Sequence, residues 1–164
     1  MTDVAAVCSE LIALDTSNYG DGTGPGEATA AEYVEAFLRG CGLHPERFST
    51  TAGNRQVVVC RIEGHDPEAD ALVVHLHLDV VPAIASDWSV PAFEGTIHDG
   101  MVWGRGAVDM KDMDAMVLTV IQQWQLSGLK PRRDIVLLFL PDEEAGGRHG
   151  AHWVVDNRPE LLHG

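Results

Sequence analysis

The chain has 164 residues, 45% of them hydrophobic, which is enough for one globular domain with a core and excludes disorder as its main state. Its 25 acidic and 11 basic residues give a formal charge of −14, which argues against a nucleic-acid partner because phosphate contacts need clustered Lys and Arg. No run approaches the roughly 18 apolar residues of a membrane span, and the start "MTDVAAVCSE" lacks the basic and apolar regions of a signal peptide. We expect a soluble, cytoplasmic protein that contacts neither nucleic acid nor membrane.

The three cysteines are odd in number and far apart, so their spacing predicts neither a disulfide framework nor a zinc knuckle. They are Cys8, Cys41 and Cys60. We expect them to be small buried hydrophobes.

Helices and strands alternate along the first hundred residues. Apolar residues at helical spacing predict helices over 3–14 and 27–41, with Gly42 capping the second, and "DTSNYGDGTGPGE" between them predicts a loop. The segments "RQVVVCRIE" and "ALVVHLHLDVV" predict strands separated by the turn "GHDPEAD". In "EGTIHDGMVWG" the pair Asp99-Gly100 predicts the turn of a hairpin.

A third helix is predicted next, ended by Gly128 and Pro131. Its expected apolar stripe consists of Met113, Met116, Val117, Val120, Ile121 and Trp124. "DIVLLFL" predicts a continuous buried strand and "GRHGAHWVVDNRP" a last helix. This order predicts an α/β fold, a three-layer sandwich around a mostly parallel or mixed central sheet.

The strand segment "VVHLHLDVVP" places His75, His77 and Asp79 on one face, because side chains alternate along a strand. The set lies at the carboxyl end of its strand, where ligands gather in open α/β sheets. An imidazole there can bind a metal while a nearby carboxylate orients the ring. Taken alone, a buried histidine bonded to a neighbouring carbonyl is the simpler interpretation.

The segment "WGRGAVDMKD" has the first two glycines of a nucleotide-binding loop, but Asp109 replaces the third and a hairpin precedes it, so phosphate binding is disfavoured. Asp109 comes directly before the third helix, where it either caps that helix or holds a carboxylate that two cations share.

In "LFLPDEEAGG" the three acids Asp142, Glu143 and Glu144 follow a buried strand. Their mutual repulsion costs stability unless a cation or a proton compensates it. In a solvated loop such a run would be ordinary, but at the end of a central strand it is not.

From about Leu11 onward these segments together resemble the M20 family of metallopeptidases and deacylases, which includes acetylornithine deacetylase, succinyl-diaminopimelate desuccinylase, aminoacylase and carboxypeptidase types. The resemblance implies a zinc-peptidase-like fold in which His77 and Glu144 each bind one metal, Asp109 bridges both, Asp79 orients His77 and Glu143 is the general base. It also implies a cis peptide bond after Asp109.

Such a site implies metal-dependent hydrolysis of an amide bond in an N-acyl amino acid or small peptide. Two cations polarise the carbonyl and activate a water, whose proton a free glutamate takes and passes to the leaving nitrogen. Zinc fits this mixture of imidazole and carboxylates, and cobalt or manganese would be tolerated.

The chain departs from the family pattern in two ways. Leu76 stands where the family has Gly, and we expect a modest effect because its side chain belongs to the apolar face. The family's later acidic ligand and last histidine have no counterpart. We therefore expect residues 1–164 to be the N-terminal portion of a metallopeptidase catalytic domain, without the dimerisation domain and the C-terminal half of the catalytic domain. Substitute ligands would be His149, His152 or His163, although single histidines are usually surface residues.

A second function, from another class, stays open: a non-catalytic metal-binding or self-associating module derived from the same fold. The open sheet edge left by the missing half would favour a homo-oligomer. Retained turnover after Glu143→Gln would support this alternative.

Overall fold

The computed structural model describes residues 2–50 and 54–163. Its central sheet has the strand order β1-β2-β6-β3, formed by β1 (Glu46–Ser49), β2 (Gln56–Ile62), β6 (Ile135–Leu140) and β3 (Leu72–His77). β1 with β2 and β2 with β6 are antiparallel, and β3 with β6 is parallel. The sheet is therefore mixed, one of the two arrangements that the sequence predicts.

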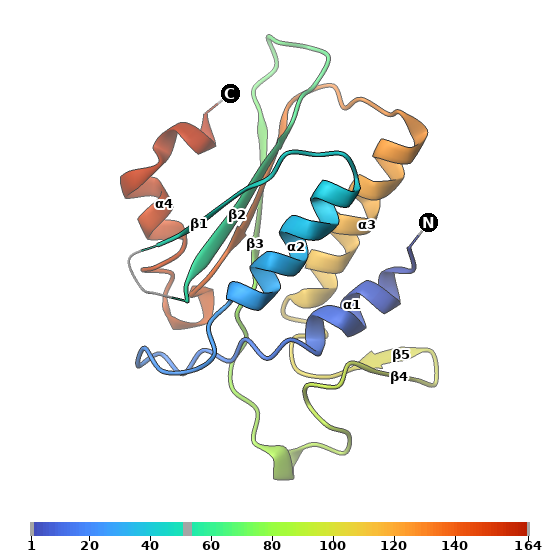
Figure 1. The fold of residues 1–164 in the computed structure, drawn as a ribbon, viewed down its shortest axis with the longest axis vertical. Helices are drawn as coiled ribbons and strands as arrows, with labels where there is room; N and C mark the ends of the chain where they lie inside the picture. The colour runs from blue at the N-terminus through green and yellow to red at the C-terminus, as the bar shows by residue number, and fades with distance from the viewer. Residues whose placement is uncertain (1, 51–53, 164) are drawn as a thin grey trace.

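Helices cover both faces of this sheet, giving the predicted three layers (Figure 1). Figure 1 shows α2 (Ala28–Gly40) and α3 (Lys111–Ser127) on one side and α4 (Ala151–Asn157) on the other. The short α1 (Val4–Ile12) packs against α3. β3, α3 and β6 form a parallel βαβ unit, so the carboxyl ends of β3 and β6 meet at one end of the sheet.

The core lies on both faces of β6, whose six residues are all buried. Leu137 and Phe139 pack toward α1, α2 and α3, whereas Val136, Leu138 and Leu140 pack toward α4. A strand covered on both faces needs apolar side chains at every position, which explains the continuous run in "DIVLLFL". Leu76 of β3 is 1% exposed and belongs to the first cluster, as its alternation predicts.

A hairpin of β4 (Thr96–His98) and β5 (Met101–Trp103) lies outside the central sheet, beside α1. Asp99 and Gly100, both at positive φ, form its turn as predicted. Three single-turn 3-10 helices complete the described elements: Ala85–Asp87, Glu143–Ala145 and Pro159–Leu162. Cys8 and Cys60 are buried as expected, but Cys41 is only half-buried.

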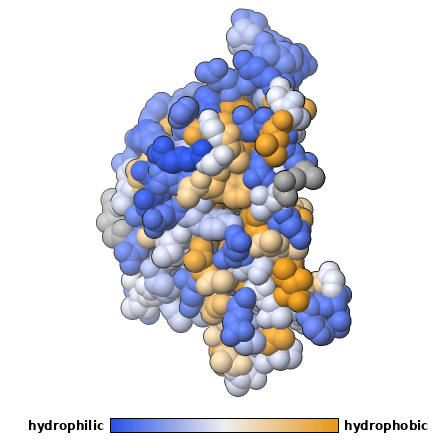
Figure 2. All heavy atoms as spheres, turned by 45° about the vertical axis from the view of Figure 1, so that its right-hand side comes forward, coloured by the Kyte–Doolittle hydropathy of each residue, from blue (hydrophilic) through white to orange (hydrophobic). Residues whose placement is uncertain are grey.

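The predicted stripe of α3 is wrong for three of its six members, whereas Val117, Ile121 and Trp124 pack against the core as expected. Met113, Met116 and Val120 are each more than 40% exposed, and the buried face instead carries Lys111, Asp114, Ala115, Leu118, Thr119 and Ile121. The reason is the contact with α1, which covers the side of α3 that bears Lys111. On the side that Figure 2 brings forward, apolar side chains accordingly reach the surface in separate patches between hydrophilic ones.

No helix among the described residues is long and apolar enough to cross a membrane. At one edge of the central sheet, β3 leaves Leu72 and Val73 exposed. This open edge is a feature that the self-associating alternative requires, and self-association itself stays a prediction.

Candidate metal centre

Three predicted ligands from three separate segments meet beyond the carboxyl ends of β3 and β6. His77, Asp109 and Glu144 each offer a ligand atom, and these atoms lie within 4.8 Å of one another. His77 is buried, Glu144 half-buried and Asp109 exposed, so the group is reached from solvent through Asp109. One imidazole and two carboxylates within this distance form a donor set that suits a divalent cation.

His77 is the last residue of β3, and its side chain is 5% exposed. Its Nε2 lies 3.2 Å from Asp109 Oδ1 and 3.7 Å from Glu143 Oε2. Burial disfavours the imidazolium, but Asp79 and Glu143 outweigh this effect and raise the pKa of His77 to about 9. The site thus stabilises a positive charge, which a bound cation would supply in place of the proton.

Asp109 lies in the turn between β5 and α3, and its carboxylate is 76% exposed. It does not cap α3, because the helix begins after Met110 and has no side-chain cap. The peptide bond between Asp109 and Met110 is cis, as the resemblance implies. Gly106 lets this turn pack closely, since a Cβ there would come within 2.9 Å of Val80 and 3.1 Å of Lys111.

Lys111 anchors the same turn from inside the protein. Although it is only 1% exposed, its ammonium donates hydrogen bonds to the backbone carbonyls of Leu11 (2.8 Å) and Leu14 (2.6 Å) at the end of α1. Burial lowers the pKa of Lys111 to about 8, against the opposing effect of Asp114. Asp114 is fully buried, neither of its oxygens has a hydrogen-bond partner among the described residues, and burial raises its pKa.

Glu143 and Glu144 form a 3-10 turn that follows β6. The turn begins after Asp142, which is held at φ 69° and accepts the backbone N–H of His149 at 2.9 Å. The side chain of Glu143 is 49% exposed, so it can reach both His77 and solvent. Burial raises the pKa of Glu144. The charge of His77 opposes this effect, and the smaller effects of the neighbouring acids add to it.

Asp79 lies beneath this turn and is fully buried. Its carboxylate accepts the backbone N–H groups of Glu143 (3.0 Å) and Glu144 (3.1 Å). The His77 ring is nearer to the backbone of Asp79 than to its carboxylate: Nδ1 lies 3.0 Å from the carbonyl oxygen and 3.6 Å from Oδ1. Asp79 therefore acts on both strand ends, orienting the ring through its carbonyl and the glutamate turn through its carboxylate.

The other predicted histidines lie elsewhere. His75 lies on β3 with much of its side chain exposed; its partial burial, with a smaller effect of His77, lowers its pKa. His149 touches Asp142 through its backbone, and His152 and His163 are exposed. None belongs to the donor group formed within residues 2–50 and 54–163.

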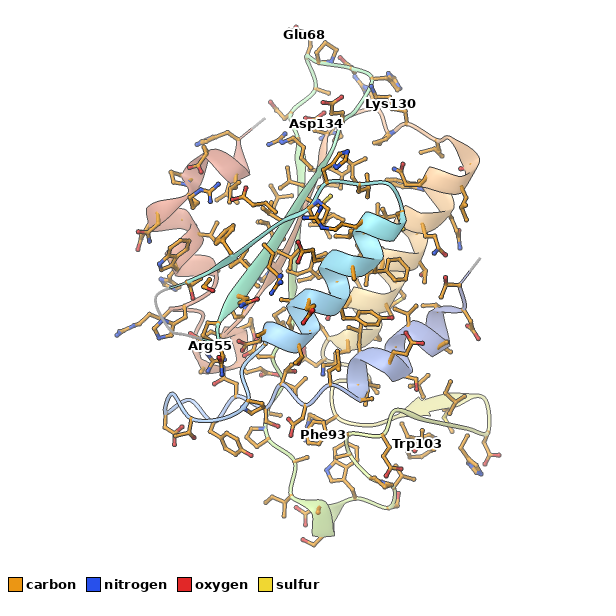
Figure 3. The ribbon with its side chains drawn as sticks, in the orientation of Figure 1. Arg55, Glu68, Phe93, Trp103, Lys130 and Asp134 are labelled. Atoms are coloured by element: carbon orange, nitrogen blue, oxygen red, sulfur yellow. The ribbon has the colours of Figure 1, made fainter. Side chains whose placement is uncertain are left out.

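A buried polar network beside Asp79 was not predicted from the sequence. It links Asn18, Arg55 and Glu27 to Asp79 and Asp142. Arg55 lies at the end of β2 nearest the segment that precedes α2 (Figure 3). The only sequence signal for this network is the polar stretch "DTSN" directly after a helix, and that stretch is equally typical of an ordinary turn.

The fold and this donor group define an α/β protein with a candidate metal centre at the carboxyl ends of adjacent strands. The model of Peptidase family M20/M25/M40 matches residues 73–163, which contain every member of the donor group. The chain belongs to this family.

The relatives agree with this assignment. Aminoacylase-1 of Sus scrofa is 34% identical over 138 residues, which are 84% of this chain and 33% of that protein. The N-fatty-acyl-amino acid synthase/hydrolase PM20D1 of Bos taurus is 36% identical over 126 residues, 74% of this chain and 24% of that protein. The chain thus spans about a third or less of the length of these relatives.

Solved structures share the fold. The M20 family metallo-carboxypeptidase Sso-CP2 from Sulfolobus solfataricus superposes with a TM-score of 0.81 at 23% identity, over 99% of this chain and 36% of its own. Human carnosine dipeptidase 1 superposes with a TM-score of 0.80 at 18% identity, over 97% of this chain and 36% of its own. The α/β architecture predicted from the sequence is confirmed.

Proposed function

We propose that the site takes part in metal-dependent hydrolysis of an amide bond in an N-acyl amino acid or a small peptide. The observation that carries this proposal is the convergence of His77, Asp109 and Glu144 within 4.8 Å, with Glu143 beside them. The names of the relatives, an aminoacylase and an N-fatty-acyl-amino acid synthase/hydrolase, point to the same substrate class.

In this proposal His77 and Glu144 would each hold one divalent ion, and Asp109 would serve both. Zinc is the ion that the donor set fits best, and cobalt or manganese would also be accepted. When bound, such ions polarise the scissile carbonyl and lower the pKa of water toward 7.

Glu143 is the proposed general base. Its carboxylate lies beside the donor group, 3.7 Å from His77 Nε2, but is not part of that group. It is therefore free to take a proton from water and to deliver it to the leaving nitrogen. Asp79 is the proposed positioning residue, since it contacts His77 and the glutamate turn but is itself fully buried.

Hydrolysis of N-acetyl amino acids and dipeptides by the zinc-loaded chain tests the proposal. Glu143→Gln should reduce turnover by about 10²–10⁴-fold and leave the bound metal unchanged. Glu63→Gln, an exposed glutamate outside the site, should have no effect. Equal turnover in the Glu143→Gln variant would overturn the assignment of the base and favour the non-catalytic alternative.

We further propose a cytoplasmic location. The three cysteines support it, because they are free and two of them are buried, which is typical of proteins from a reducing compartment.

A further inference from the structure

Asn18 is a loop residue between α1 and α2, yet it is only 4% exposed. Its backbone N–H donates to Val80 O at 2.8 Å, and Val80 in turn forms a bridge with Ser17, so this part of the loop is fixed beside the end of β3. The Asn18 side chain points into the buried space behind the candidate metal centre, where its partners are two carboxylates and a guanidinium.

The Asn18 side chain uses its full hydrogen-bonding capacity. Its amide nitrogen donates to Asp79 Oδ2 (2.8 Å) and Asp142 Oδ1 (3.2 Å). Its oxygen accepts from Arg55 Nη2 (2.9 Å) and from the backbone of Gly20 (3.1 Å). Because Arg55 and the Gly20 N–H only donate, and ionised carboxylates only accept, the orientation of the amide is fixed by its neighbours.

The two carboxylates that Asn18 joins are those that support the glutamate turn. Asp79 receives the N–H groups of Glu143 and Glu144, and Asp142 is the residue directly before them. Both are buried, and Arg55 lies 3.8 Å from Asp142. Two donors from one amide join these carboxylates and fix their positions, which an apolar side chain could not do.

We propose that Asn18 is a positioning residue of the metal centre: it fixes Asp79 and Asp142, and through them it fixes Glu143 and Glu144 opposite His77. This inference rests on the proposed function, since it assigns Asn18 a part in the same site. Among the described residues the Asn18 side chain has no hydrogen bond to the three proposed ligands, so its effect on them passes through the two aspartates.

The test is a zinc titration of the 164-residue chain against a chromophoric chelator, for the wild type, Asn18→Ala and a control, Val34→Ala. Val34 is fully buried in α2 and outside the site, so its truncation destabilises the protein without touching the network. Asn18→Ala should weaken zinc binding by about 10–100-fold, the range typical of residues that orient ligands. Val34→Ala should stay within about twofold of the wild type, since distant sites act independently.

Urea unfolding of the metal-free proteins provides the stability of each variant, so that a change in affinity can be separated from a loss of folding. If Asn18→Ala does not fold, Asn18→Ser replaces it. Serine keeps one donor on a side chain one atom shorter, and we expect weakening that still exceeds that of Val34→Ala.

Zinc affinity of the folded Asn18 variant equal to that of Val34→Ala would overturn the inference and leave the proposed function standing. A wild-type chain that binds no zinc would contradict the proposed function and this inference together.

Discussion

The carboxylate of Asp79 accepts the backbone N–H of Glu144 at 3.1 Å, although 65 residues separate them in the sequence. This bond joins the end of β3 to the turn after β6, and it fixes the position of Glu144 relative to His77. Because β3 and β6 are parallel neighbours, a short contact between their carboxyl ends is enough to assemble the donor group.

Replacing Asp79 by Asn should weaken zinc binding by about 10–100-fold, because the amide keeps one acceptor and turns a donor toward the remaining N–H. Zinc titration measures the effect. Asp134→Asn is the matched control: Asp134 also accepts a backbone N–H, that of Gly64 at 2.8 Å, but lies at the opposite end of the sheet from Arg55 (Figure 3). Equal affinities of the two variants would show that the bond to Glu144 has no part in the site.

The fold and the donor group could be predicted from the sequence, but the buried polar residues that hold the donor group in place could not. "DIVLLFL" predicted β6 because a strand covered on both faces is apolar throughout, and His77, Asp109 and Glu144 were found through the motifs around them. By contrast, the buried face of α3 includes Lys111, which the sequence pattern did not predict. Nothing in a helical pattern shows that an ammonium is buried, because its partners are backbone carbonyls at the end of another helix.

Asn18, Arg55 and Glu27 were missed for a related reason. Each is polar and lies in or beside a loop, where such residues are usually solvated, and their partners are distant in the sequence. Their importance follows from tertiary contacts that no spacing pattern encodes.

Glu27→Gln should flatten the pH dependence of stability. Glu27 is fully buried against Arg55, and one of its oxygens has no hydrogen-bond partner among the described residues. Burial, against the effect of Arg55, raises the pKa of Glu27 from 4.5 to about 7. Between these values the folded protein holds a proton that the unfolded chain has released, so stability falls as the pH rises from 4.5 through 7.

Between pH 4.5 and pH 8 the free energy of unfolding of the wild type should fall by about 2–3 kcal/mol relative to that of Glu27→Gln. Urea unfolding at intervals of pH measures this difference. Glu32→Gln, at an exposed position of α2, the helix that Glu27 precedes, should give a pH dependence parallel to that of the wild type. Parallel curves for Glu27→Gln as well would contradict the assigned pKa shift.

Lys111→Met should lower the free energy of unfolding by about 1–3 kcal/mol, because the carbonyls of Leu11 and Leu14 lose a buried charged donor. Methionine keeps most of the volume, so the change reports the hydrogen bonds rather than a cavity. Lys130→Met, at an exposed lysine, should remain within about 0.5 kcal/mol of the wild type. Chemical denaturation compares the two, and an equally small change for Lys111→Met would contradict its anchoring role.

Gly26→Ala should destabilise the protein more than Gly22→Ala. Both glycines have positive φ, 71° and 80°, so alanine brings the same backbone strain of about 1–2 kcal/mol at each. A Cβ at Gly26 would also lie 2.4 Å from Asn54 Cβ, whereas a Cβ at Gly22 meets nothing within 4 Å. Gly26→Ala should therefore cost about 1–3 kcal/mol more than Gly22→Ala, the usual cost of overpacking, and thermal unfolding measures the difference. Equal melting temperatures would mean that the loop before α2 does not pack tightly on Asn54.

The central claim is that His77, Asp109 and Glu144 form a metal centre, and elemental analysis after dialysis tests it most directly. The wild-type chain should retain about one or two equivalents of zinc, and the double variant His77→Ala, Asp109→Ala should retain none. A wild-type chain without zinc, or a double variant that holds as much as the wild type, would contradict the account.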